Sequence, residues 1–132
     1  MKIGELAQVA QCTVETVRYY EKEGLLPAPA RTAANYRRYG RAQLDRLRFI
    51  RNCRALDMTH EEIRALLSLT DQPSGDCRAV NQLLDEHIAH VDARIAELTQ
   101  LKQQLGELRQ RCQSEQALAA CGILQGLAAM ET

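Results

Sequence analysis

The sequence predicts a mostly helical protein in which two short helices, joined by a tight turn, precede one long helix. Leu, Ile, Val and Ala carry the apolar content of the 132 residues, whereas Trp is absent and Phe occurs once. Such a composition suits helices better than a large aromatic core. Apolar residues recur in steps of three or four over most of the chain, which is the spacing of one helix face. Clusters of proline, glycine and polar residues at 27–29 and 71–76 interrupt this pattern.

The first part of the chain predicts a helix, a turn and a second helix. The first helix is marked by apolar residues at helical spacing: Ile3, Leu6, Ala7 and Ala10. Residues 11–12 form the tight connection. Thr13 can cap a helix over about 14–22, because its hydroxyl can accept a free backbone N–H. Gly24 suits the left-handed end of that helix, and the prolines after it cannot continue it.

A short strand and two further helices are expected next. Residues 35–39 alternate aromatic and basic side chains, as a solvent-facing strand does, and can form a small hairpin with residues 26–34. A third helix is expected over about 41–56. Thr59 and Glu62 have the spacing of a capping box, so a fourth helix begins there and lasts to about residue 69.

One long helix, over about 77–112, follows the break at 71–76. Its apolar stripe consists of Leu84, Ile88, Val91, Ile95, Leu98, Leu101, Leu105, Leu108 and Cys112. A lone helix with such a stripe leaves its seam in water, so the pattern favours dimerisation. The expected organisation is an N-terminal domain over 1–70, a hinge over 71–76, a dimerisation helix over 77–112, and a loop with a short helix (about 121–130) over 113–132.

A net charge of zero hides an asymmetry between the two halves of the chain. Residues 1–56 hold 11 Lys and Arg against 5 Asp and Glu, and residues 57–132 hold 6 against 12. A basic first half is what a protein that docks on phosphates needs, although a solvated basic face has the same signature. The sequence contains no run of about 18 apolar residues, which is the length needed to span a membrane. The N-terminus lacks the apolar stretch of a signal peptide, so a cytoplasmic location is expected.

Two short helices joined by a tight turn in a basic region describe a helix-turn-helix, whose second helix enters the major groove of double-stranded DNA. The side chains expected on or beside its exposed face, within reach of base edges and phosphates, are Thr13, Thr16, Arg18 and Tyr20. Arg31, Arg37 and Arg38 lie on or near the expected hairpin and can contact the DNA backbone. The alternative is a small helical domain whose tyrosines are simply part of the core.

The cysteines suggest a metal site that two subunits share. In a reducing compartment, Cys77, Cys112 and Cys121 are better interpreted as packing residues or metal ligands than as a disulfide framework. If 77–112 is one helix, Cys77 and Cys112 are roughly 52 Å apart in one chain and cannot share an ion. In an antiparallel dimer, Cys77 of one subunit would meet Cys112 and Cys121 of its partner. Cys77 also lies at a helix N-terminus, where the dipole favours the thiolate.

Three thiolates with no obvious fourth ligand favour a soft metal ion, since structural zinc usually takes four ligands. The alternative is that Cys77 and Cys112 are small buried apolar residues. The remaining cysteines, Cys12 and Cys53, are expected to be structural. His87 and His90, three residues apart on the long helix, could form an accessory metal site, although surface or interface histidines are commoner.

Three segments closely resemble the MerR family of transcription regulators: 13–21 (Thr-Val-Glu-Thr-Val-Arg-Tyr-Tyr-Glu), 24–26 (Gly-Leu-Leu) and 35–39 (Asn-Tyr-Arg-Arg-Tyr). The resemblance implies a winged helix-turn-helix, an antiparallel coiled-coil homodimer, and a promoter whose two polymerase-binding elements are spaced too far apart. The inducer-bound dimer would distort that DNA so that bacterial RNA polymerase engages both elements. The DNA contacts that the resemblance implies are Thr16, Arg18, Tyr20, Arg31, Tyr36, Arg37 and Arg54, the last on the resemblance alone.

The resemblance also bears on the inducer. Segments 51–58, 85–88 and 121–125 are most similar to the cadmium and lead regulators of the family, and a cysteine at position 77 is typical of its divalent-ion branch rather than its copper(I) branch. The spacing from Cys112 to Cys121 is, however, also that of the mercury branch. The inducer implied is therefore Cd(II) or Pb(II), with Hg(II) and Zn(II) as further candidates.

Other classes of function have less support in the sequence. A glycine-rich phosphate loop and a Ser/His/Asp or Cys/His arrangement are not evident, so an enzyme is not expected. A metal-buffering protein would use the same cysteines, but the basic first half argues against it. A regulator that senses thiol oxidation through these cysteines stays open.

Overall fold

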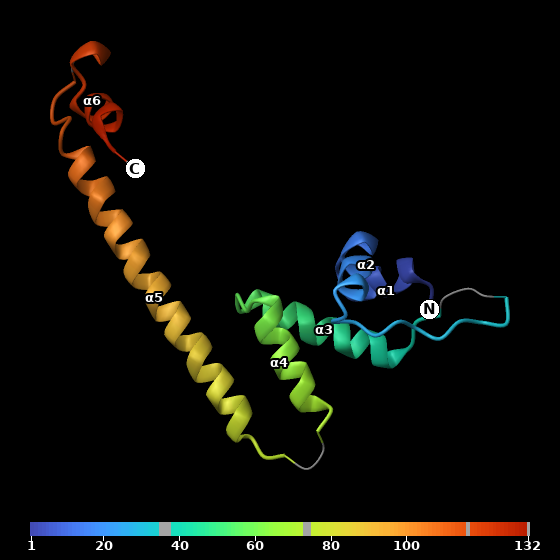
Figure 1. Ribbon diagram of the computed structural model, residues 1–132. Coiled ribbons are helices and arrows are strands. Elements are labelled where there is room, and N and C mark those ends of the chain that lie inside the picture. Colours follow the sequence, from blue (N-terminus) through green and yellow to red (C-terminus); the bar gives the residue numbers. More distant parts are fainter. Residues whose placement is uncertain (35–37, 73–74, 116, 132) are drawn as a thin grey trace. The chain divides into compact units, whose positions relative to one another are not determined.

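The computed structural model describes residues 1–34, 38–72, 75–115 and 117–131, and within them the chain is mostly helical, as predicted (Figure 1). The helices are α1 (Ile3–Val9), α2 (Val14–Lys22), α3 (Arg41–Ala55), α4 (His60–Thr70), α5 (Arg78–Arg109) and α6 (Gly122–Ala129), with a 3-10 turn, η1 (Leu118–Ala120), before α6. None of these helices is long and apolar enough to cross a membrane. The chain forms two compact units, Met1–Leu84 and Asp85–Thr132.

The turn between α1 and α2 is tight because one residue adopts a left-handed backbone. Gln11 has φ 59°, and the Cys12 N–H donates to the Ala7 carbonyl at 2.9 Å. The Thr13 hydroxyl then accepts the Thr16 N–H at 3.1 Å, which confirms the predicted cap of α2. The two helices consequently pack against each other as a helix-turn-helix.

The segment after α2 reverses the chain and carries the two arms of the expected hairpin. Gly24 has φ 76°, as predicted for the end of this helix. Arg31 forms an isolated bridge, and the Arg38 N–H donates to the Ala30 carbonyl at 2.9 Å. The predicted strand over 35–39 falls mainly on residues 35–37, which lie outside the described residues; no longer strand occurs in the part of the chain that the structure describes.

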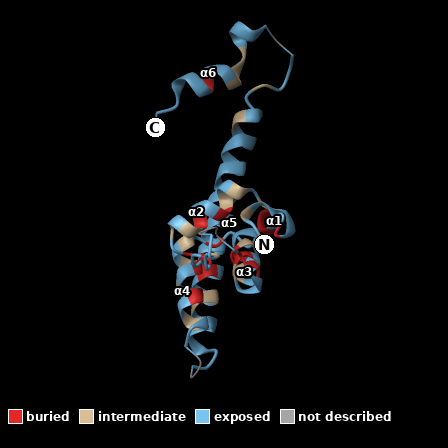
Figure 2. Ribbon diagram, turned by 90° about the vertical axis from the view of Figure 1, so that its right-hand side faces the viewer, coloured by how far each residue is buried: buried red, intermediate tan, exposed pale blue. Residues whose placement is uncertain are grey.

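The buried residues gather among the helices of the N-terminal unit (Figure 2). The fully buried aliphatic side chains, each 0% exposed, are Leu6, Val17, Leu47, Ile50 and Ile63. Each contributes about 1.5–3 kcal/mol through burial. Leu83 and Leu84 of α5 also pack against this core, so the unit extends past the hinge predicted at 71–76 into the first turns of the long helix.

The capping box of α4 is confirmed, since the Glu62 N–H donates to the Thr59 hydroxyl and the Thr59 N–H to the Glu62 carboxylate, at 3.1 and 2.9 Å. By contrast, α5 leaves its apolar stripe open in the single chain. Six side chains of this stripe are between 38% and 65% exposed: Ile88, Val91, Ile95, Leu98, Leu101 and Leu105. We refer to these six residues as the α5 seam.

Candidate nucleic-acid interface and metal centre

Helix α2 presents its polar side chains to solvent because its apolar side is fixed in the core. Val17 is fully buried, whereas Thr13 and Arg18 are exposed and Thr16 is half-buried. The hydroxyls of Thr13 and Thr16 lie 2.9 Å apart. The start of α2 therefore offers two neighbouring hydroxyls and, further along the helix, an exposed guanidinium. These groups hydrogen-bond base edges and phosphates.

The predicted exposure of Tyr20 is wrong. The sequence placed this residue on the exposed face with Thr13 and Thr16. Its side chain is 8% exposed and belongs to the core, as does Tyr39 at 2%. Tyr20 packs edge-on against His60, with ring centroids 6.0 Å apart. The exposed tyrosine of α2 is instead its neighbour Tyr19, at 46%. A DNA contact from Tyr20 stays a prediction, whereas its ring is packed in the core.

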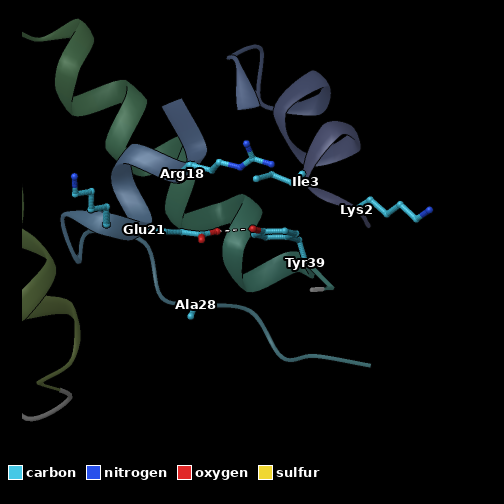
Figure 3. A pocket seen from close by; sticks show the side chains of 7 residues that line it. Lys2, Ile3, Arg18, Glu21, Ala28 and Tyr39 are labelled. Atoms are coloured by element: carbon cyan, nitrogen blue, oxygen red, sulfur yellow. Dashed lines mark hydrogen bonds between the residues drawn. The ribbon is translucent and has the colours of Figure 1, made fainter. Parts of the chain in front are cut away.

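A hollow of about 740 Å³ lies beside α2 and is rimmed by cations (Figure 3). Its lining includes Lys2 and Lys22 together with Arg18. One acidic group, Glu21, accepts the Tyr39 hydroxyl at 2.5 Å. Lys2 and Lys22 were not among the sequence candidates; the signal that could have found them is their position in the basic half, next to the two short helices.

The remaining DNA candidates lie on the segment after α2 and on α3. Arg31 and Arg38 are exposed, as a phosphate contact requires. Arg54 is exposed and its guanidinium donates to the Met58 carbonyl. Two further candidates, Tyr36 and Arg37, lie outside the described residues. Arg18, Lys2 and Lys22 line one hollow, and a DNA contact from Arg18 or from the other arginines stays a prediction.

We expect Arg18→Ala to weaken binding to operator and unrelated DNA alike. Loss of one phosphate contact should also make the slope of log K against log salt shallower by about 0.9. Fluorescence anisotropy over a salt series measures both quantities. Lys102→Ala, which removes an exposed cation from α5, is the matched control and should leave the slope unchanged. An unaltered slope in Arg18→Ala would remove this residue from the phosphate contacts.

Two of the three candidate metal ligands meet at the junction of α5 and α6. Cys112 follows the end of α5. The Arg109 guanidinium donates to the Cys112 carbonyl at 2.6 Å, and the Cys112 thiol donates to the Ser114 carbonyl at 3.6 Å. Cys121 directly precedes α6. Although its thiol makes no conventional capping hydrogen bond, the amides of Leu124 and Ile123 and the Cys112 thiol lower the pKa of Cys121, against a smaller opposing effect of burial.

Cys77 lies just before the start of α5 and is exposed. Its carbonyl accepts the Asn81 N–H at 2.9 Å, and the Asp76 carboxylate caps the Arg78 N–H at 2.9 Å. The 32 residues of α5 make a helix about 48 Å long, which separates Cys77 from Cys112 within one chain. A site that contains both cysteines therefore needs two chains.

The other two cysteines have the surroundings of structural residues. Cys53 is buried among the core side chains, and Cys12 packs partly against them. Burial raises the pKa of both thiols, and for Cys12 the nearby Arg51 guanidinium partly offsets this effect. Neither thiol has the combination of exposure and thiolate character that metal binding requires.

These pKa directions predict an order of thiol reactivity. With limiting iodoacetamide near neutral pH, Cys121 should be alkylated well before Cys12 and Cys53, because the thiolate is the reactive species. Raising the pH should narrow the difference as the other thiols ionise. Peptide mass spectrometry measures the order, and the same reaction in concentrated urea, where the differences should vanish, is the control. Equal rates in the folded protein would contradict the prediction.

The two histidines proposed as an accessory site are one turn apart on α5. His87 is buried and His90 is exposed. One ring nitrogen of each lies within 4.8 Å of the other, a separation that a shared ion could bridge. The accessory site stays a prediction.

With this geometry in place, comparison with known proteins defines the class of protein. The chain matches the family described as MerR HTH family regulatory protein over residues 1–70, and the family described as MerR, DNA binding over residues 44–108. A regulatory protein of Haemophilus influenzae, the HTH-type transcriptional regulator ZntR homolog, is 49% identical over 111 residues, which is 84% of this chain and 82% of the relative. The protein is thus a DNA-binding transcription regulator, and it belongs to the MerR family.

Two further relatives have metals in their descriptions. The mercuric resistance operon regulatory protein of Bacillus cereus is 35% identical over 126 residues, 96% of each chain. The crystal structure of the transcription regulator PbrR691 from Ralstonia metallidurans CH34 in complex with lead(II) matches with a TM-score of 0.85 and 52% identity, covering 96% of this chain and 98% of that one.

Proposed function

We propose that this protein is a metal-responsive transcription regulator that binds its promoter as a homodimer. A soft divalent ion would be held by Cys77 of one subunit and by Cys112 and Cys121 of the other. Binding of the ion would distort the promoter so that RNA polymerase activates metal-resistance genes. Bending a site of 20–30 base pairs costs on the order of 1–6 kcal/mol, which a tightly bound ion can supply through different affinities for two dimer states.

The observation that carries the proposal is the meeting of two thiols at one end of α5 while the third lies before its other end. In the single chain Cys77 is exposed and Cys112 and Cys121 are only half-buried, so all three thiols are accessible for an ion that two subunits would share. The open α5 seam supplies the surface for a second subunit. Antiparallel pairing along this seam would complete two equivalent sites.

The inducer we propose is Cd(II) or Pb(II), with Hg(II) and Zn(II) as further candidates. Thiolates prefer soft ions, and three of them with no obvious fourth ligand in the sequence suit an ion that accepts low coordination. The likeness to the lead(II)-bound regulator supports Pb(II). The likeness to the mercuric resistance operon regulatory protein of Bacillus cereus supports Hg(II) as a further candidate.

A thiol-based redox sensor is the second candidate, because the Cys112 thiol lies next to that of Cys121, whose pKa is lowered. Hydrogen peroxide would oxidise the two thiols to a disulfide and would itself be reduced to two molecules of water, which take up the two thiol protons. A metal sensor would change promoter activity when the metal ion is added, and a redox sensor would do so when peroxide is added.

Anaerobic titration of the reduced protein with Cd(II), Pb(II), Hg(II) and Zn(II) tests the proposal. Thiolate-to-metal absorption reports binding, competition with a chelator gives the order of affinity, and transcription from the promoter in vitro reports the response. We expect one ion per subunit in the wild type and a loss of this tight binding in Cys77→Ser. Tight binding that is indifferent to Cys77, or a promoter that responds to peroxide but to none of the ions, would overturn the proposal.

A further inference from the structure

Helix α6 packs against the end of α5 so closely that a side chain has no room at its first position. A Cβ atom added to Gly122 would lie 2.6 Å from the Arg111 carbonyl oxygen and 3.1 Å from the Arg111 Cβ. Real Cβ atoms essentially never approach another atom to less than 3.0 Å. The nearest atom belongs to the backbone, so a substitution would have to displace the helix itself.

The same close approach recurs one turn later. Gly126 is buried, and a Cβ added there would collide with the Arg111 guanidinium and lie 3.1 Å from Leu108 Cδ1. In this case the nearest atom is the far end of a flexible side chain, which can move aside. Two glycines in an eight-residue helix weaken it, because glycine is a poor helix former, and the contact with Arg111 explains why both are accommodated.

The contact lies directly beside the two thiols. Cys112 follows Arg111 in the chain, and Cys121 precedes Gly122. Anything that moves the first turn of α6 away from the Arg111 backbone therefore moves Cys121 away from Cys112. By contrast, Gly106 within α5 has no atom within 4 Å of its added Cβ, so close approach is particular to the glycines of α6.

We propose that Gly122 and Gly126, seated on Arg111, are positioning residues that fix the distance between the Cys112 and Cys121 thiols. The spacing of the thiols is a property of the metal-free chain. Its consequence, a high affinity of the metal centre, rests on the proposed function. A preformed pair of ligands binds more tightly than one that the ion must assemble, because the cost of ordering the loop has already been met.

Cross-linking of the reduced, metal-free protein with dibromobimane tests the spacing, since the reagent bridges only thiols that lie close together. A Cys77→Ser background removes the competing exposed thiol. The bridged product is easy to identify, because no Lys or Arg lies between 112 and 121 and both cysteines remain in one tryptic peptide. Gly122→Ala should lower the bridging rate by tenfold or more, on the order expected for displacements of about 1 Å. Gly106→Ala is the matched control and should bridge at the parental rate.

Arg111→Ala separates positioning from general damage to the fold. Gly126→Ala should have a smaller effect than Gly122→Ala, and adding Arg111→Ala should restore its bridging rate by removing the guanidinium that the new methyl group meets. The same addition should not rescue Gly122→Ala, whose clash is with the backbone carbonyl. A bridging rate in Gly122→Ala equal to that of Gly106→Ala, or equal rescue of both variants, would overturn the proposal.

Titration with Cd(II) in the Cys77-containing protein then separates this inference from the proposed function. We expect Gly122→Ala to bind Cd(II) at least tenfold more weakly than the wild type, in proportion to its loss of bridging. If the wild type bound no metal while the bridging results held, the proposed function would fail and the positioning contact would stand. Tight Cd(II) binding that was unchanged in Gly122→Ala would refute the positioning role alone.

Discussion

Two variant dimers that each fail to bind metal tightly should recover binding when their subunits are exchanged. Cys77→Ser and Cys121→Ser should each lower the affinity for Cd(II) by at least about 100-fold, because a serine hydroxyl is a poor ligand for a soft ion. In the mixed dimer, one site contains both serine substitutions, while the other site has all three of its cysteines. Random exchange makes half of the dimers mixed, and each mixed dimer holds one ion. About a quarter of an ion per subunit should therefore be restored.

This recovery distinguishes a shared site from any site within one chain. If the ion were held by a single subunit, each subunit of the mixed dimer would still lack a ligand and nothing would be restored. The matched control exchanges Cys77→Ser with the double variant Cys77→Ser, Cys121→Ser, a mixture that contains no Cys77. Differently tagged subunits allow the mixed dimer to be isolated and its metal content measured. An isolated mixed dimer without tightly bound metal would refute the shared site.

Local signals made much of the fold predictable. The bounds of α2 follow from Thr13 and Gly24, each of which satisfies a need of its own helix end. The capping box of Thr59 and Glu62 likewise defines the start of α4 from residues three apart. The pattern of α5 was equally clear, because its seam repeats over many turns. These features depend on neighbours in sequence, so they could be predicted before the fold was known.

Features that depend on distant neighbours could not be predicted. The burial of Tyr20 reflects packing of the whole N-terminal unit, and helical spacing alone grouped this residue with the exposed Thr13 and Thr16. The close contact between Gly122 and Arg111 depends on how the chain folds back after α5, and no local sequence pattern encodes this. For the proposed metal centre, the sequence already grouped Cys112 with Cys121, but the contact of Gly122 with Arg111 beside these thiols required the structure.

Leu98→Lys should convert the protein from a dimer into monomers and abolish both metal and operator binding. Leu98 is 49% exposed in the α5 seam, where a second subunit would cover it. Losing one buried leucine from each subunit costs about 3–6 kcal/mol, which corresponds to a dimer dissociation constant raised by about 100-fold to about 20,000-fold. Placing a lysine charge in an apolar seam adds to this cost. Sedimentation equilibrium over a concentration series measures the change.

Gln100→Lys provides the matched control, because it adds the same charge about 200° around the helix from Leu98. It should remain dimeric and keep its metal. If Leu98→Lys stayed dimeric and still bound one ion per subunit, the α5 seam would not be the dimer interface. The two losses expected for Leu98→Lys have a common cause. Separated subunits can neither bring Cys77 to the partner's thiols nor engage two half-sites of DNA at once, so a single substitution far from both sites tests whether dimerisation links them.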